Sequence, residues 1–210
     1  GVEGSDVTII DAVGLGNAAF TVDSGETGAT VVSGFTLSGD GHLETDTSSY
    51  SCTSIITCTD WYYPYCGGGA YVSGADPTFQ DIIAADSALP AASVTVSYPD
   101  THYIYSYGGG MCFLDSAATV SGSEVTYNYA DQGGGVFADE TSALDFSTST
   151  IAGNSASDGG GFELEGGSLG STNLVSMFNE ADTEGGGFFL VDASATLVNT
   201  THAGDDAPTG

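Results

Sequence analysis

The stretch GGGVFADETSALDFSTSTIAGNSASDGGGFELEGG, which runs from Gly133 to Gly167, contains two triple glycines that begin 26 residues apart. The chain has five triple glycines in all, and the intervals between their first residues are 41, 25, 26 and 26 residues. They begin at Gly67, Gly108, Gly133, Gly159 and Gly185. A regular period of this length is typical of a solenoid, in which each repeat packs only against its neighbours.

The residues after each triple glycine alternate between constant and variable character. The first and third residues are apolar in every copy, as in Phe162 and Leu164. The second residue varies, being Tyr71, Cys112, Phe137, Glu163 or Phe189. Such alternation predicts a short strand whose first and third side chains point into a core. Two further apolar stretches follow in most repeats and signals for helices are almost absent, so we expect three short strands per repeat.

Three short strands in about 25 residues predict an all-β chain folded as a parallel β-helix of about seven rungs. Residues 1–210 are expected to form this single domain. The triple glycines are then corners where the backbone turns with positive φ and where stacked chains approach too closely for a Cβ atom. A polar residue recurs at another corner, as Asp86, Asn128, Asn154 and Asn179, and we expect the side-chain amides of the asparagines there to form a hydrogen-bonded ladder.

Three motifs carry a resemblance to a known group of proteins: the triple glycine before an apolar-x-apolar strand, the opening DVTIID…AAFTVDSG…ATVVSGFTLSG, and the N-x-A…GGG exit. They resemble secreted right-handed β-helix repeat proteins, and are similar to the polymorphic outer-membrane-protein repeats with their GGA/I and FxxN signatures. Asn128, Asn154 and Asn179 match the asparagine of FxxN, but the phenylalanine three residues before it is absent. The resemblance covers almost the whole chain outside two insertions. It implies a right-handed β-helix and a surface role in adhesion, self-association or structure.

Two insertions, at about residues 40–66 and 89–106, interrupt the period just before a triple glycine. Because both leave the same corner on neighbouring rungs, we expect them side by side on one flank. Six of their aromatic residues are candidates for a surface that meets a sugar or another copy of the chain: Trp61, Tyr62, Tyr63, Tyr65, Tyr103 and Tyr105. The alternative is that these rings only pack against one another in a small knob tied by disulfides.

The four cysteines are Cys52, Cys58, Cys66 and Cys112, and their spacing is not that of a zinc site. Two disulfides are expected in an exported chain, and three connectivities are open. The favoured pairing is Cys52 with Cys58, which closes a short loop, and Cys66 with Cys112, which ties adjacent rungs.

The charge composition restricts the partners, because the chain has 28 Asp and Glu residues and no Lys or Arg. Nucleic acids and anionic membrane surfaces require cationic side chains, so neither is expected as a partner. No apolar run is long enough to span a membrane. The self-repulsion of a net charge of -28 would be relieved by high salt, by bound divalent cations or by low pH.

Acidic residues just beyond the first strand of successive repeats are candidate calcium ligands: Asp115, Asp139, Glu140 and Asp192. Hard carboxylate oxygens in a column suit Ca²⁺, which is therefore the one cofactor considered. The sequence Asn199-Thr200-Thr201 is an acceptor for N-glycosylation, which makes Asn199 a candidate site.

The sequence contains only weak indications of an enzyme. A glycosidase acting on neutral polysaccharides needs two carboxylates, and its candidates on one flank are Asp139, Glu140, Glu163 and Glu165. We expect instead that these residues are at solvated outward positions. Polysaccharide lyases and uronate-binding enzymes require Arg or Lys, and the sequence contains neither. We therefore expect no enzymatic activity.

The expected function is that of an extracellular or cell-surface structural protein, secreted with its signal peptide already removed, that self-associates or adheres. End-to-end stacking into a filament is one form of that self-association. The expected partners are other copies of the chain or cell-surface glycans. The alternatives are a glycan-binding module and a neutral-polysaccharide glycosidase on the same scaffold.

Overall fold

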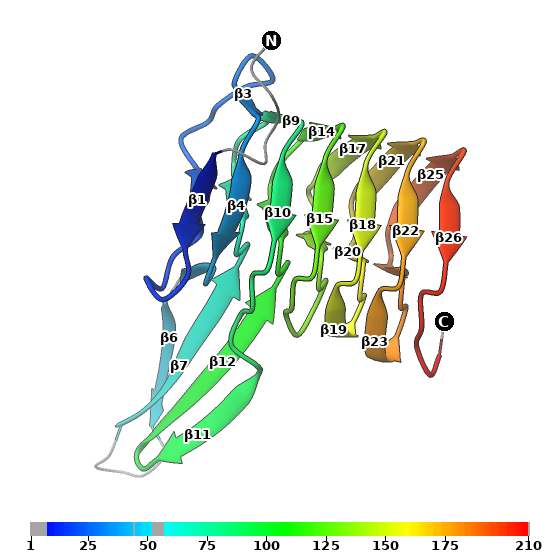
Figure 1. The fold of residues 1–210 in the computed structure, drawn as a ribbon. Coiled ribbons are helices and arrows are strands. Elements are labelled where there is room, and N and C mark those ends of the chain that lie inside the picture. Colours follow the sequence, from blue (N-terminus) through cyan, green and yellow to red (C-terminus); the bar gives the residue numbers. More distant parts are fainter. Residues whose placement is uncertain (1–7, 44, 52–56, 210) are drawn as a thin grey trace.

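In the computed structural model, which describes residues 8–43, 45–51 and 57–209, short strands stack into three parallel sheets around one core (Figure 1). The described residues contain no helix, and the predicted all-β parallel β-helix is confirmed. Successive rungs pair in parallel along each sheet, as β13, β16 and β20 do. Within the described part of the chain, no helix is present that could cross a membrane.

Each sheet is made of strands that recur once per rung. Sheet 1 contains β1 (Ile9–Ala12), β4 (Thr36–Gly39), β10 (Ile83–Ala85), β15 (Glu124–Thr126), β18 (Thr150–Ala152), β22 (Val175–Met177) and β26 (Thr201–Ala203). Sheet 2 contains β2 (Phe20–Val22), β8 (Ala70–Ser73), β13 (Met111–Leu114), β16 (Val136–Ala138), β20 (Phe162–Glu165) and β24 (Phe188–Val191). Sheet 3 contains β3 (Val31–Ser33), β9 (Thr78–Gln80), β14 (Thr119–Ser121), β17 (Ala143–Ser147), β21 (Ser168–Thr172) and β25 (Ser194–Val198). A short pair, β19 (Ser155–Asp158) and β23 (Glu180–Glu184), lies beside them.

The core is filled by the side chains that the alternation predicts to point inward. Phe113, Phe146 and Phe162 are fully buried between the sheets. The rings of Phe146 and Phe162 meet edge to face, with centroids 5.1 Å apart, which is a favourable geometry for aromatic pairs. Each large apolar side chain buried in this way stabilises the fold by about 1.5–3 kcal/mol.

The triple glycines form the corner that the sequence predicts. The first glycine of each run has φ between +57° and +65°. A Cβ atom on Gly135 would lie 2.6 Å from the carbonyl oxygen of Gly161 in the next rung, a contact that no side chain tolerates. The repeat therefore needs glycine both to turn the chain and to stack the rungs.

A buried amide ladder joins successive rungs at another corner. Asn154 Oδ1 accepts hydrogen bonds from the backbone nitrogen and Nδ2 of Asn128, each at 3.0 Å, and Asn179 does the same for Asn154. In the rung before Asn128, the prediction of Asp86 at this polar corner was wrong. Ser87 stands in the ladder instead and donates its backbone N–H to Asn128, because Asp86 occupies the turn before it with φ 56°.

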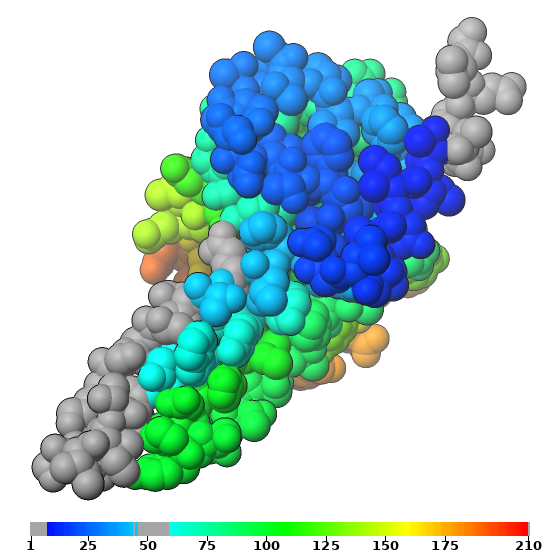
Figure 2. Space-filling view, turned by 90° about the vertical axis from the view of Figure 1, so that its left-hand side faces the viewer, coloured from blue at the N-terminus to red at the C-terminus, as the bar shows by residue number. Residues whose placement is uncertain are grey.

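The two insertions leave the solenoid together and form an arm, a separate sheet that projects from one flank (Figure 1). Its strands are β5 (His42–Leu43), β6 (Asp46–Ser51), β7 (Thr57–Cys66), β11 (Ser93–Ser97) and β12 (Asp100–Tyr107). β7 and β12 come from different insertions and pair in parallel, so the expectation that the insertions lie side by side is confirmed. Figure 2 shows the arm, coloured cyan and green, extending from the body of the solenoid.

A buried carboxylate fastens the arm to the rung beneath it. Asp131 accepts hydrogen bonds from the backbone nitrogens of Ala92, at 2.8 Å, and Ser106, at 3.1 Å. The Ser106 hydroxyl donates to the same carboxylate at 2.9 Å. Asp131 therefore holds both ends of the second insertion, just before β11 and near the end of β12.

Candidate functional site

The parallel pairing of β7 and β12 sorts the predicted aromatic residues onto two opposite faces of the arm. Tyr62 pairs with Tyr103, and Tyr105 lies two residues further along on the same side. We call these three residues the tyrosine face. Trp61, Tyr63 and Tyr65 point to the other side, because successive strand residues alternate. The structure thus brings the six candidates into one sheet but not onto one surface.

The rings of the tyrosine face share one orientation. Tyr62 and Tyr103 stack with centroids 5.0 Å apart and planes within 9°. Tyr103 and Tyr105 are 6.3 Å apart with planes within 2°. All three are partly exposed, so the rings form an ordered aromatic surface that solvent reaches.

The opposite face is organised around a histidine. The ring of His102 stacks on those of Trp61, at 6.2 Å, and Tyr63, at 5.8 Å. The Tyr63 hydroxyl and His102 Nδ1 lie 3.2 Å apart and share a hydrogen bond. The polar end of Tyr63 is therefore already occupied by a neighbour in the arm.

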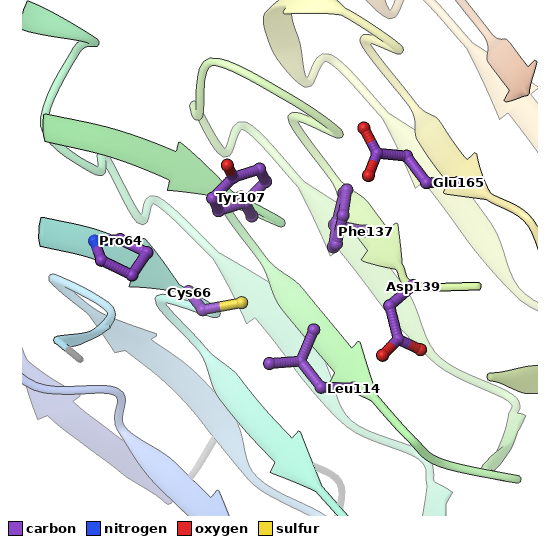
Figure 3. A pocket seen from close by; sticks show the side chains of 7 residues that line it. All are labelled: Pro64, Cys66, Tyr107, Leu114, Phe137, Asp139 and Glu165. Atoms are coloured by element: carbon purple, nitrogen blue, oxygen red, sulfur yellow. The ribbon is translucent and has the colours of Figure 1, made fainter. Parts of the chain in front are cut away.

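A pocket of about 240 Å³ lies where the arm meets sheet 2, and we call it the base pocket (Figure 3). It is lined by Pro64, Cys66, Tyr107, Leu114, Phe137, Asp139 and Glu165. Its walls are mostly apolar, and the ring centroids of Tyr107 and Phe137 lie 4.9 Å apart with a tilt of 53°. Figure 3 shows the two carboxylates pointing away from each other, with Glu165 reaching from β20 toward the Phe137 ring.

The base of the arm is held by a disulfide and a small second core. Cys66, at the end of β7, is bonded to Cys112 on β13, as predicted. Both cysteines are buried with Tyr71 and Phe137 on the outward face of sheet 2. The other predicted pairing, Cys52 with Cys58, falls on residues outside those whose side chains the structure describes.

Glu163 is the most unusual side chain in the described part of the chain. It is fully buried, and neither carboxyl oxygen has a hydrogen-bond partner. It stands in register between Phe137 on β16 and Phe189 on β24. Burial, and then the nearby charges of Glu165 and Asp158, raise the pKa of Glu163 to about 8 against the lowering effect of the Gly133 backbone, so the carboxyl is mostly protonated at neutral pH.

The solvated outward position expected for Glu163 is therefore wrong. The second residue after each triple glycine does face away from the main core, but Glu163 stands in register between Phe137 and Phe189 and is fully buried there. Burial raises the pKa of Tyr107, followed in effect by the Glu165 charge, and this places Tyr107 in the same covered, acidic region.

Three of the four predicted calcium ligands meet at one shallow hollow. Asp139, Glu140 and Asp192 line it together with Glu165. The Asp139 carboxylate instead accepts hydrogen bonds from the backbone nitrogen of Asp115, at 3.1 Å, and from the Ser142 hydroxyl, at 2.6 Å. Among the described residues, no group of three or more His, Cys, Asp or Glu side chains could hold a metal ion. The positions of these carboxylates therefore do not support the predicted column of calcium ligands.

Asn199 lies on the surface of the last rung. Its side chain is exposed, and its Nδ2 donates to Asn173 Oδ1 in the rung before. The glycosylation sequon is therefore accessible at a turn, where φ of Asn199 is 54°. Whether it is modified stays a prediction.

Two functional features of the arm were missed by the sequence reading. Asp131, which anchors the arm, follows the ladder residue Asn128 by three positions and looks like any other acidic residue of a turn. The base pocket combines Pro64 of one insertion with Phe137 and Glu165 of later repeats, and only their contact in the fold relates them. Comparison of the chain with protein families, with curated proteins and with solved structures found no match in any of the three.

Proposed function

We propose that the chain is an extracellular binding module for neutral glycans, in which the β-helix presents the arm and the tyrosine face makes the contact. The observation that carries this proposal is the common orientation of Tyr62, Tyr103 and Tyr105, whose ring planes agree within 9°. Parallel rings offer a sugar one stacking direction, and tyrosine hydroxyls can exchange hydrogen bonds with its hydroxyls.

The negative charge of the chain favours neutral glycans over acidic ones. No Lys or Arg is present to neutralise a uronate or sulfate group, whereas 28 acidic residues repel one. A neutral chain has no such penalty. The rigid tyrosines also lose little conformational entropy when they bind, because each has only two rotatable side-chain bonds.

The extracellular location is part of the same proposal. The bonded Cys66–Cys112 pair suits an oxidising compartment, where disulfides persist. The insertions leave the solenoid at one flank, which is where repeat proteins place their binding loops.

The experiment is a titration of the purified chain with cellohexaose, followed by the amide and ring NMR signals of the arm. We expect the signals of Tyr103 to shift, and Tyr103→Ala to weaken binding by about tenfold, equivalent to about 1.4 kcal/mol. The matched control is Tyr63→Ala, which removes the same side chain from the opposite face of the same sheet. If Tyr63→Ala abolishes binding and Tyr103→Ala does not, the contact lies on the other face. If a panel of neutral oligosaccharides gives no shifts at all, the proposal fails.

Self-association is a second candidate, and a different observation favours it. β11 is the outermost strand of the arm sheet, and its outer edge has no partner among the described residues. Val94 and Val96 on this strand are 59% and 72% exposed. An open edge with exposed β-branched residues favours pairing with another strand, here the β11 of a second copy.

Sedimentation velocity distinguishes this candidate from a monomeric module. We expect a dimer that Val96→Lys dissociates, because a charge on an edge strand opposes pairing. The control is Val191→Lys, which adds the same charge at an exposed valine of β24, away from the arm. A wild-type chain that remains a monomer at the highest soluble concentration excludes pairing through β11.

A further inference from the structure

The base pocket combines two features that together recognise a cation. Its aromatic wall is formed by the tilted rings of Tyr107 and Phe137, 4.9 Å apart. Its acidic side is formed by Glu165 and Asp139. A positive charge over an aromatic face and beside a carboxylate is stabilised by both, and more strongly where water is partly excluded.

The two carboxylates of the pocket differ in whether they already accept hydrogen bonds from the protein. Asp139 is held by the backbone of Asp115 and by the Ser142 hydroxyl. Glu165, by contrast, has no hydrogen-bond donor or ion-pair partner among the described residues, and its side chain extends toward Phe137 (Figure 3). Glu165 is therefore the carboxylate that remains available to an incoming donor.

A fully buried and unpaired carboxyl stands next to this pocket. Glu163 lies two residues before Glu165 on the same face of β20, in register with the pocket residue Phe137. Neither of its oxygens has a partner. Burial, followed by the negative charges of Glu165 and Asp158, raises the pKa of Glu163 and so favours its protonated form.

The chain cannot supply the missing cation itself. Its sequence has no Lys and no Arg, so a second copy cannot place either side chain in the pocket. The net charge of -28 attracts basic partners over long distances and increases their rate of association.

From these observations we propose that the base pocket receives an arginine side chain of a basic partner protein. The planar guanidinium stacks on the Phe137 ring, with the tilted Tyr107 ring beside it, while its N–H groups donate to the Glu165 carboxylate. Arginine is favoured over lysine because its planar, weakly hydrated group stacks on rings and forms paired hydrogen bonds. This inference does not depend on glycan binding by the tyrosine face, which lies further out on the arm.

The test uses N-acetyl-arginine amide as the probe and N-acetyl-citrulline amide as its neutral counterpart of nearly the same shape. Binding is followed by the ring signals of Phe137 and Tyr107 in NMR titrations of the full chain. We expect the arginine compound to bind at least about tenfold more tightly than the citrulline compound, and more tightly than N-acetyl-lysine amide. Equal binding of arginine and citrulline compounds overturns the proposal, and tighter binding of the lysine compound overturns the assignment to arginine.

Variants separate the pocket from general attraction to an acidic protein. Glu165→Gln should weaken binding of the arginine compound by about tenfold, and Phe137→Leu should weaken it severalfold. The control is Glu124→Gln, which removes the same unit of charge from the exposed face of sheet 1 and should change the affinity less than twofold. If Glu124→Gln and Glu165→Gln weaken binding equally, the cation is held only by the overall charge and the pocket has no part in it.

A second readout tests the participation of Glu163. A bound cation favours the ionised form of Glu163, so binding at neutral pH should release protons to the buffer. The charged or titratable groups that act on Glu163 are Glu165, Asp158 and Tyr107. Calorimetry in two buffers of different ionisation enthalpy should detect the released protons in wild type and not in Glu163→Gln. Binding without proton release would remove Glu163 from the site.

Discussion

Glu163 occupies on β20 the place that Phe137 occupies on β16, and the two residues are partners in the parallel pairing of these strands. A carboxyl group thus stands in a column of aromatic side chains, buried and without a hydrogen bond. Such a group is tolerated only in its neutral form, because ionisation in an apolar environment is costly.

The first prediction concerns the pH dependence of stability. The unfolded chain loses the Glu163 proton near its ordinary pKa of 4.5, whereas the folded chain keeps it up to about pH 8. The contribution of Glu163 to the free energy of unfolding is therefore fully present below about pH 4.5. It falls by on the order of 4–5 kcal/mol as the pH rises to about 8. Glu163→Gln should remove this loss.

Urea unfolding of both proteins at about pH 5 and pH 9 checks this prediction. We expect the wild type to lose stability relative to Glu163→Gln between the two values, with the variant the more stable at the higher pH. Other carboxylates contribute equally to both proteins and cancel in the difference. Parallel pH profiles would mean that Glu163 is ionised in the folded state.

The second prediction concerns the amide ladder. Asn154 Nδ2 donates to the Val125 carbonyl, at 2.9 Å, and to Asn179 Oδ1, at 3.0 Å. Asn154→Asp keeps the shape but loses both donors and buries a charge, so it should cost about 3 kcal/mol or more at pH 7. The control is Asn199→Asp, an exposed amide, which should change stability by less than about 1 kcal/mol. Thermal unfolding of both variants gives the comparison, and equal effects would contradict a structural role for the buried ladder.

The third prediction concerns the attachment of the arm. Asp131→Ala removes the acceptor for the backbone nitrogens of Ala92 and Ser106, and should loosen the arm without unfolding the solenoid. Trypsin has no site in this chain, but chymotrypsin cleaves after the arm tyrosines and reports their exposure. We expect cleavage in the arm to become about tenfold faster or more, because the variant loses all three hydrogen bonds that the Asp131 carboxylate accepts from the arm. Asp182→Ala, an exposed acidic position, should leave the rate unchanged.

The fourth prediction concerns the disulfide. Cys66 and Cys112 are 46 residues apart in the sequence, and their disulfide joins the base of the arm to the next rung. The double variant Cys66→Ala/Cys112→Ala should lower the unfolding free energy by about 3–4 kcal/mol, because the unfolded chain is no longer constrained by this loop. Urea unfolding measures the difference. A change below about 1 kcal/mol would show that the second core alone holds the base of the arm.

Much of the solenoid can be predicted from the sequence because its rules are local and repeat. Gly133 and Gly159 stand where the backbone must turn with positive φ. The alternation of Phe162, Glu163 and Leu164 indicates which side chains face the core. Asn154 sits one repeat after Asn128, so the ladder follows from spacing alone. Asp86 was predicted at the polar corner but lies one residue before it, in the turn, because acidic and amide residues suit both positions.

The sequence by itself determined the fold class and the stacked glycine corner, and it favoured the pairing of Cys66 with Cys112 among three open connectivities. Its lack of Lys and Arg also disfavours anionic ligands. Only the tertiary structure decided which rings of the arm share a face, because the parallel register of β7 and β12 couples residues about 40 positions apart. It also decided the environment of Glu163. The exposure of Glu163 depends on what packs against the outward side of its sheet, and no local pattern around Glu163 records that packing.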